Sequence, residues 1–135
     1  MELALIMTIL SVVVLGAIDF GRIAYMAMAL TNAARQGAMV GSQTSATSTQ
    51  YSTMQLAAQA SASADIGAIT AVATRSCACD VGGTVTVMGS CTAACLGFVQ
   101  IRVTVTTSKT FNTVTRFPGL YNSVSLSRQA IMRAQ

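Results

Sequence analysis

The chain of 135 residues contains no histidine, no tryptophan and a single proline. Without histidine, Ser-His-Asp and Cys-His catalysis and histidine-ligated metals are excluded. The whole chain has only four carboxylates, namely Glu2, Asp19, Asp65 and Asp80, which leaves little for chemistry that needs two carboxyl groups. We therefore predict a protein that is not an enzyme and that uses no cofactor and no metal.

Charge is also scarce. Charged residues make up 9% of the chain and hydrophobic residues 53%, whereas an average soluble domain is roughly a quarter charged. The net charge is +4, but the Lys and Arg residues of the later two thirds are scattered, so no nucleic-acid partner is predicted. This composition favours a membrane-associated or self-assembling protein.

The longest uncharged run lies near the N-terminus, where residues 3–18 stand between Glu2 and Asp19. As a helix, this run would be about 24 Å long, against about 30 Å for the hydrocarbon core of a bilayer. A secretory signal peptide is the alternative, but such a peptide begins with positive charge, and Glu2 has the opposite sign. We expect a hydrophobic helix that anchors the chain in a membrane or forms the core of an assembly.

The helix is predicted to continue to residue 41. Residues 19–41 contain no proline and many strong helix formers. Asp19 and Arg22 stand three positions apart, so their side chains can pair on one face of the helix. The sequence thus indicates one helix with an apolar first half and an amphipathic second half.

Small residues recur every fourth position in this helix, at Ala29, Ala33, Gly37 and Gly41. Such spacing lets two helix backbones approach closely. Alanine is also simply a good helix former, so the pattern has a plainer explanation. We favour packing of Ala29, Ala33 and Gly37 against helices of other copies of this chain.

Glu2 places a carboxylate at the start of the apolar helix, where burial of an unpaired charge is costly. One explanation is a charge at headgroup level, favoured by the helix dipole. The other is an ion pair with the α-amino group of a neighbouring subunit. Both stay open at the level of the sequence.

The rest of the chain predicts a small α+β head. Residues 42–50 are polar and uncharged, which is typical of a linker, and residues 51–69 have a weak helical period. The pattern then changes to the two-residue period of strands at residues 84–88, 98–107 and 124–132. We expect a small antiparallel sheet whose apolar face is covered by the long helix.

Two details of the predicted sheet concern its breaks. Asp80 to Gly83 is a turn signal directly before the strand at residues 84–88, and Phe117 to Gly119 is a second break, after the strand at residues 98–107. In the last strand Arg128 falls on the apolar face, which requires a β-bulge or a stem that carries the guanidinium to water.

Four cysteines, Cys77, Cys79, Cys91 and Cys95, lie within nineteen residues. Zinc-ligand pairs usually have two to four intervening residues, and the pair Cys77 and Cys79 departs from that spacing. We therefore predict two disulfides, which place the head outside the cytoplasm. The sequence leaves the connectivity open, although Cys77–Cys79 is the least comfortable pair.

Three short segments resemble a known family. They are ELAL at residues 2–5, IDFGR at residues 18–22 and ALTNAARQGA at residues 29–38. Together with the apolar run, they are similar to the TadE-like family of minor pilins and pseudopilins. The resemblance is dense over about forty residues and loose beyond residue 41.

The resemblance implies a pilin-like structural subunit of a tight-adherence or type IV pilus-like filament. Such a protein is inserted in the inner membrane, cut by a prepilin peptidase and drawn by the pilus assembly machinery into an extracellular filament of the same chain. Residues 1–41 would form the membrane and filament-core helix, 42–50 a linker and 51–135 the head. Two alternatives are a minor subunit that primes or caps another pilus, and a membrane-anchored extracytoplasmic binding protein.

Overall fold

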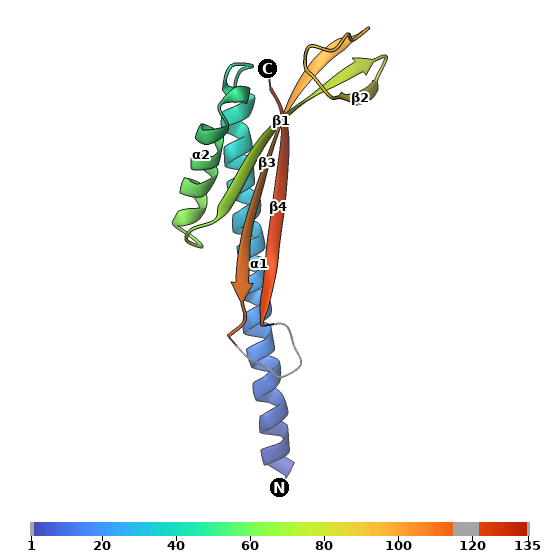
Figure 1. Cartoon of the computed structure of the whole chain (residues 1–135). Coiled ribbons are helices and arrows are strands. Elements are labelled where there is room, and N and C mark those ends of the chain that lie inside the picture. Colours follow the sequence, from blue (N-terminus) through green and yellow to red (C-terminus); the bar gives the residue numbers. More distant parts are fainter. Residues whose placement is uncertain (1, 115–121, 135) are drawn as a thin grey trace.

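The computed structural model describes residues 2–114 and 122–134, leaving aside the side chains of residues 2, 4 and 5. The elements in chain order are α1 (Glu2–Ser42), the 3-10 turn η1 (Thr47–Thr49), α2 (Tyr51–Ser63), β1 (Thr70–Val81), β2 (Thr84–Met88), β3 (Phe98–Asn112) and β4 (Ser123–Arg133). Figure 1 shows an elongated molecule in which α1 extends well below the other elements. The predicted α+β class is confirmed.

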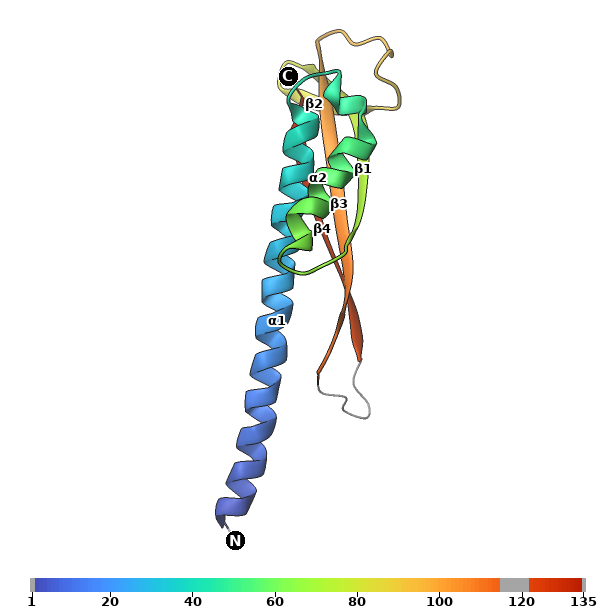
Figure 2. The ribbon, with the colours of Figure 1, turned by 90° about the vertical axis from the view of Figure 1, so that its left-hand side faces the viewer.

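Helix α1 has 41 residues, which corresponds to a length of about 62 Å. Proline is absent from this stretch, and Gly16 and Gly21 do not interrupt it. Only its second half lies beside α2 and the sheet, whereas its first half projects as a free rod (Figure 2). One continuous helix therefore joins the head to the projecting segment.

The sheet is antiparallel, with the strand order β2-β1-β3-β4. The predicted alternation is confirmed in the middle of β3, where Val103 and Val105 are fully buried while their neighbours are partly exposed. It is wrong near the start of the strand, where Val99 is 44% exposed and Gln100 is buried with its amide donating a hydrogen bond to Asp80. The strand runs further than predicted, to Asn112, and its next inward position after Val105 is Thr107. The hydroxyl of this buried threonine donates a hydrogen bond to the carbonyl oxygen of Leu30 in α1 at 2.9 Å, so the polar group is satisfied inside the core.

Strand β4 pairs with β3 in one unbroken register from Arg102↔Arg133 to Asn112↔Ser123. The described register therefore contains no bulge at Arg128. This side chain is exposed, and its guanidinium donates a hydrogen bond to the carbonyl oxygen of Ser127 at 3.0 Å. Of the two arrangements predicted for Arg128, the structure shows the second, in which the side chain extends so that its guanidinium reaches solvent.

The core lies between the sheet on one side and α1 and α2 on the other. Its upper cluster combines Ala38, Met54, Ala58, Ala71, Ala73, Val103 and Val105. Its lower cluster combines Leu30, Ala33, Ala62 and Ile69. Many of these residues are alanines, so the helices and the sheet approach closely and the head stays thin.

Two segments differ from the sequence-based expectation. Helix α2 ends at Ser63 rather than at residue 69, and the chain turns at Gly67, whose φ is +74°. The ammonium group of Lys109 donates hydrogen bonds to the carbonyl oxygens of Ile66 and Ala68 and so holds this turn against β3. Strand β1 then begins at Thr70, in a segment for which no separate strand was predicted.

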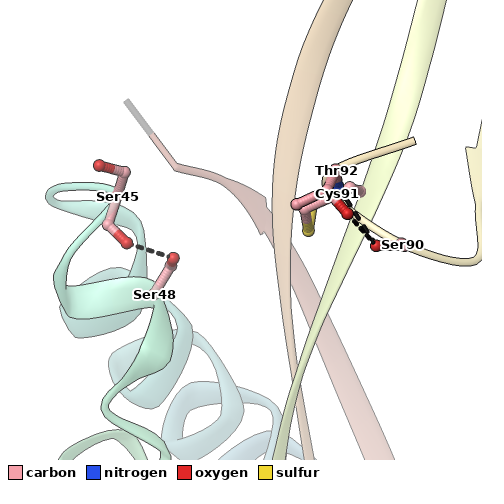
Figure 3. Close-up of a disulfide and its surroundings, with 6 residues drawn as sticks. Ser45, Ser48, Ser90, Cys91 and Thr92 are labelled. Carbon is pink, nitrogen blue, oxygen red and sulfur yellow. Dashed lines mark hydrogen bonds between the residues drawn. A yellow bond between two sulfur atoms is a disulfide. The ribbon is translucent and has the colours of Figure 1, made fainter. Parts of the chain in front are cut away.

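The polar segment 42–50 folds as a compact corner that contains η1. Ser48 is fully buried there, and its hydroxyl donates to the carbonyl oxygen of Ser45 at 2.6 Å (Figure 3). The turn predicted from Asp80 to Gly83 is present, with positive φ at Gly82 and Gly83. The break predicted at Phe117 to Gly119 lies outside the described residues.

Candidate assembly surface

The projecting part of α1, residues 3–18, is here called the stalk. Its described large side chains are exposed along the whole segment, between 40% for Leu15 and 74% for Leu3. The described strands and α2 lie above most of this rod (Figure 1). A surface of this size and hydrophobicity is not stable in water, so the stalk must be covered by lipid or by another protein.

Helix length and composition support the same conclusion. The stretch Ile6–Ser42 is the one helix among the described residues that is long and apolar enough to cross a membrane, and its most apolar 18-residue window has a mean hydropathy of 1.9. Only 6% of its most apolar window is buried inside the molecule. It therefore differs from the core helix of a soluble protein, which is apolar because its own fold covers it.

The stalk ends at a polar junction with the head. Asp19 is 7% exposed, and its Oδ1 atom accepts hydrogen bonds from the backbone N–H of Val114 at 3.2 Å and from Nη1 of Arg22 at 3.4 Å. The guanidinium carbon of Arg22 lies 5.1 Å from the centre of the Phe111 ring, within the range of a cation–π contact. The predicted pairing of Asp19 with Arg22 is thus present, and it belongs to a larger cluster that ties α1 to the lower end of β3.

The small residues of α1 lie within the head. Ala33 belongs to the lower core cluster. A Cβ atom added to Gly37 would lie 2.8 Å from the carbonyl oxygen of Met54 and 3.1 Å from Cβ of Ala58, both in α2. Ala29 is 7% exposed. The close approach made possible by the small residues is therefore between α1 and α2 of one chain, and a role for Ala29, Ala33 and Gly37 between chains stays a prediction.

The four cysteines lie at the other end of the molecule and form two disulfides, Cys77–Cys91 and Cys79–Cys95. Each joins strand β1 to the loop between β2 and β3. On this loop Thr92 and Ser90 also contact each other, with 2.8 Å between their hydroxyl oxygens (Figure 3). The structure therefore selects one of the three connectivities that the sequence allowed.

Glu2 begins α1, at the far end of the stalk from the head. Its side chain lies outside the described part of the structure. The two explanations offered for its charge therefore both stay predictions.

With this geometry in place, the chain can be compared with known proteins. Residues 1–39 match the family model described as TadE-like protein. The resemblance predicted from the sequence is confirmed over this segment. No curated protein and no solved structure matches the chain.

The TadE-like segment coincides with most of α1. It contains the stalk, the Asp19–Arg22 pair and the small residues that contact α2, and it stops before α1 ends at Ser42. The α2–β1–β2–β3–β4 part of the head lies outside the match. The TadE-like match indicates a protein associated with a Tad pilus. The matched segment includes the stalk, whose apolar side chains are exposed.

Sequence reasoning missed the partners of Asp19 and Arg22, which lie just after β3 and within it. Val114 follows Asp19 by 95 positions and contributes its backbone amide, for which no sequence signal exists. Phe111 had a signal, because it continues the inward alternation of Val103 and Val105, but the predicted strand stopped at residue 107.

Proposed function

We propose that this protein is a structural subunit of a Tad-type, type IV pilus-like filament and that it polymerises through its N-terminal helix. The role is structural rather than catalytic. Before assembly the stalk lies in the inner membrane, and after assembly it lies in the core of an extracellular filament. The pilus assembly machinery and a prepilin peptidase are the further partners that the TadE-like resemblance implies.

One observation carries the proposal. The unbroken helix α1 forms the exposed apolar stalk with its first half and packs into the folded head with its second half. A membrane anchor alone has no need of a rigid connection to its domain. In a filament, however, the position of each head is set by the packing of its stalk, and a continuous helix transmits that position. The close match of residues 1–39 to the TadE-like family supports the same assignment.

The energetics of assembly follow from the surroundings of the stalk. Lipid tails are as apolar as its valine, leucine and isoleucine side chains, so leaving the bilayer gains little from the hydrophobic effect. Association of stalks then depends on van der Waals packing. Gly16 and Ala17 let neighbouring helices come close on one side of the rod.

The two disulfides indicate on which side of the membrane the head lies. Disulfides form and persist in oxidising compartments, and both lie in the head. The head therefore belongs on the extracytoplasmic side, with the Glu2 end of α1 toward the cytoplasm. This orientation is the one from which a filament outside the cell can grow.

The proposal is tested by producing the full chain together with its assembly machinery and examining sheared material by electron microscopy. A matched pair of variants is Leu10→Lys in the stalk and Leu56→Lys on α2, since their side chains are exposed to 56% and 65%. We expect fibres from the wild type and from Leu56→Lys, and none from Leu10→Lys. A membrane-bound chain that never appears in fibres would contradict the proposal and favour a membrane-anchored binding protein.

A second candidate function is a minor subunit that primes or caps a pilus made of another protein. The family to which residues 1–39 are similar favours it, because the resemblance is to minor pilins. Quantitative mass spectrometry of purified fibres separates the two roles. A filament subunit is the dominant protein along the fibre, whereas a priming or capping subunit is present in a few copies per fibre.

A further inference from the structure

The head has an exposed apolar surface at the end farthest from the stalk, which we call the distal tip. It consists of Val85, Val87, Leu96 and Phe98. Leu96 is 99% exposed and Phe98 is 79% exposed. Exposed apolar residues that gather in this way mark interaction sites more often than chance exposure does.

The distal tip is rigid and almost free of charge. Residues 81–101 contain no Asp, Glu, Lys or Arg, and charged residues are depleted in the cores of protein interfaces. The carboxylate of Asp80, which stands between Val85 and Phe98 in the sheet register, accepts hydrogen bonds from Nε2 of Gln100 at 2.7 Å and from the N–H of Gly83 at 3.1 Å. The two disulfides fix the loop that carries Leu96, so docking orders few side chains.

A groove lies at the opposite end of the head, where the stalk begins. This base groove has a volume of about 450 Å³, and its apolar walls are formed by Ile18, Tyr25, Met26, Ile66 and Phe111. Arg22 and Asp65 supply its charged groups. The guanidinium of Arg22 lies beside Phe111 and Asp19, so its position at the groove is fixed by contacts within the chain.

We propose that the distal tip of one copy docks in the base groove of the next copy. The two surfaces lie at opposite ends of the head (Figure 1). A contact between two different surfaces of the same molecule is heterologous, and when it cannot close into a ring it generates an open filament. The contact therefore extends along one line of subunits in the direction of α1.

The choice of a second copy as the occupant follows from continuity with the stalk. Ile18 is the last residue of the stalk and also lines the base groove, so covering one surface places a neighbour beside the other. The tip offers the ring of Phe98 to a groove in which the ring of Tyr25 is 52% exposed, and aromatic pairs add stability beyond the area they bury.

The distance along α1 by which two docked copies are displaced also determines what lies beside the stalk. From Arg22 to Ser42 the helix rises about 30 Å, and the stalk is about 24 Å long. When the base groove of an upper copy receives the tip of a lower copy, the upper stalk runs beside the second half of the lower α1. One side of the exposed apolar rod is thereby covered by the copy that holds its head, and its other sides face further stalks.

This proposal rests on the proposed filament, and the first experiment detects the contact itself. In the full chain, a photo-reactive benzoylphenylalanine replaces Leu96, and in a control it replaces Leu56 on α2. We expect irradiation to give dimers in which tryptic peptide 76–102 of one copy is joined to peptide 23–35 or 110–116 of another, as these contain Tyr25, Met26 and Phe111. The control position gives no such product.

The second experiment measures the contribution of the contact to assembly. Leu96→Asp removes no buried contact within the monomer, and the disulfide-bonded monomer on a non-reducing gel verifies that the head has folded. We expect filament yield to fall about tenfold or more, since a loss of 1.4 kcal/mol per contact is a factor of ten in association. Leu56→Asp leaves the yield unchanged.

The outcomes separate the two proposals. Filaments of Leu96→Asp at the wild-type yield, or cross-links from position 96 only to other proteins or to peptides outside the groove, would overturn the tip-to-groove contact while leaving the filament intact. Dimers that map to the groove in cells without any filament would support the contact and contradict the proposed filament.

Discussion

The carboxylate of Asp19 accepts a hydrogen bond at 3.2 Å from the backbone N–H of Val114, a residue 95 positions further along the chain. This bond joins the point where the stalk leaves the head to the lower end of the β3–β4 hairpin. The same oxygen pairs with Arg22, whose guanidinium lies against Phe111. The cluster therefore fixes the angle between the projecting helix and the head.

Replacement of Asp19 tests this role. We expect Asp19→Ala to lower the free energy of unfolding by about 1–3 kcal/mol, because the part-buried hydrogen bond from the N–H of Val114 to a charged carboxylate is lost. Thermal unfolding of the detergent-solubilised chain measures the loss, and hydrogen exchange of the Val114 amide should accelerate. An unchanged exchange rate would show that the bond does not hold the hairpin.

Two further variants separate the hydrogen bond from the charge. Asp19→Asn keeps a carbonyl oxygen for Val114 and should cost less than Asp19→Ala. Arg22→Ala removes a partner whose side chain is 48% exposed, so it should cost about 1 kcal/mol or less. If Arg22→Ala were as damaging as Asp19→Ala, the ion pair would be the main tie instead.

Gly37 provides a test of the contact between α1 and α2. An alanine Cβ there would lie 2.8 Å from the backbone oxygen of Met54, so α2 must shift. We expect Gly37→Ala to destabilise the head by about 1–3 kcal/mol, although alanine is the better helix former. The matched control is Gly21→Ala, where an added Cβ meets no atom within 4 Å and stability should rise by about 0.5–1 kcal/mol.

The disulfide connectivity requires paired variants. Trypsin leaves all four cysteines in the single peptide 76–102, which has no internal Lys or Arg before its last residue. We expect Cys77→Ser with Cys91→Ser to retain one disulfide, detected as a 2 Da gain on reduction (about one hydrogen per sulfur). The mismatched pair Cys77→Ser with Cys95→Ser should leave two free thiols.

Stability provides a second measurement on the same variants. The sequence separations of 14 and 16 residues correspond to about 3 kcal/mol for each disulfide in the chain-entropy model. Each matched double variant should lose about that amount and the mismatched one more. Release of stoichiometric zinc on denaturation of the wild type would instead contradict the disulfide assignment.

Glu2 is tested by its effect on assembly. Because a carboxylate in an apolar surrounding needs a partner, Glu2→Ala should reduce the number of filaments while the chain still inserts in the membrane. Counting fibres by electron microscopy and measuring the chain in the membrane fraction gives both quantities. Fibre numbers equal to those of the wild type would exclude a role for Glu2 in assembly.

The sequence predicted the elements whose patterns are locally regular. Strand β2 has the predicted bounds, β4 differs by one residue at each end, and α1 ends one residue beyond the prediction. Strand β1 was missed for a physical reason. In its first half Ala71 and Ala73 are buried while Thr70, Val72 and Thr74 are exposed, but the inward alanines are small and the outward Val72 is apolar, so the sequence shows little contrast between the two faces. In its second half the consecutive residues Cys77, Ala78 and Cys79 are all buried.

The candidate site was predictable only in part. The apolar stalk and the Asp19–Arg22 pair follow from composition and helical spacing. The tie to Val114 and the turn held by Lys109 depend on contacts between segments far apart in the chain, which no local pattern encodes. The exposure of Leu96 and Phe98 was equally hidden, because apolar residues near a predicted sheet are expected to be buried.

The unbroken course of α1 has a mechanical consequence. In the proposed filament, tension applied to a head would reach the stalk along a single rod of backbone hydrogen bonds, with no break in α1 at which the load could be relaxed. Separation of the sheet from this rod would begin at the lower end of the hairpin, where Asp19 accepts the hydrogen bond from Val114. The junction would therefore carry the force that stretching the proposed filament concentrates on each subunit.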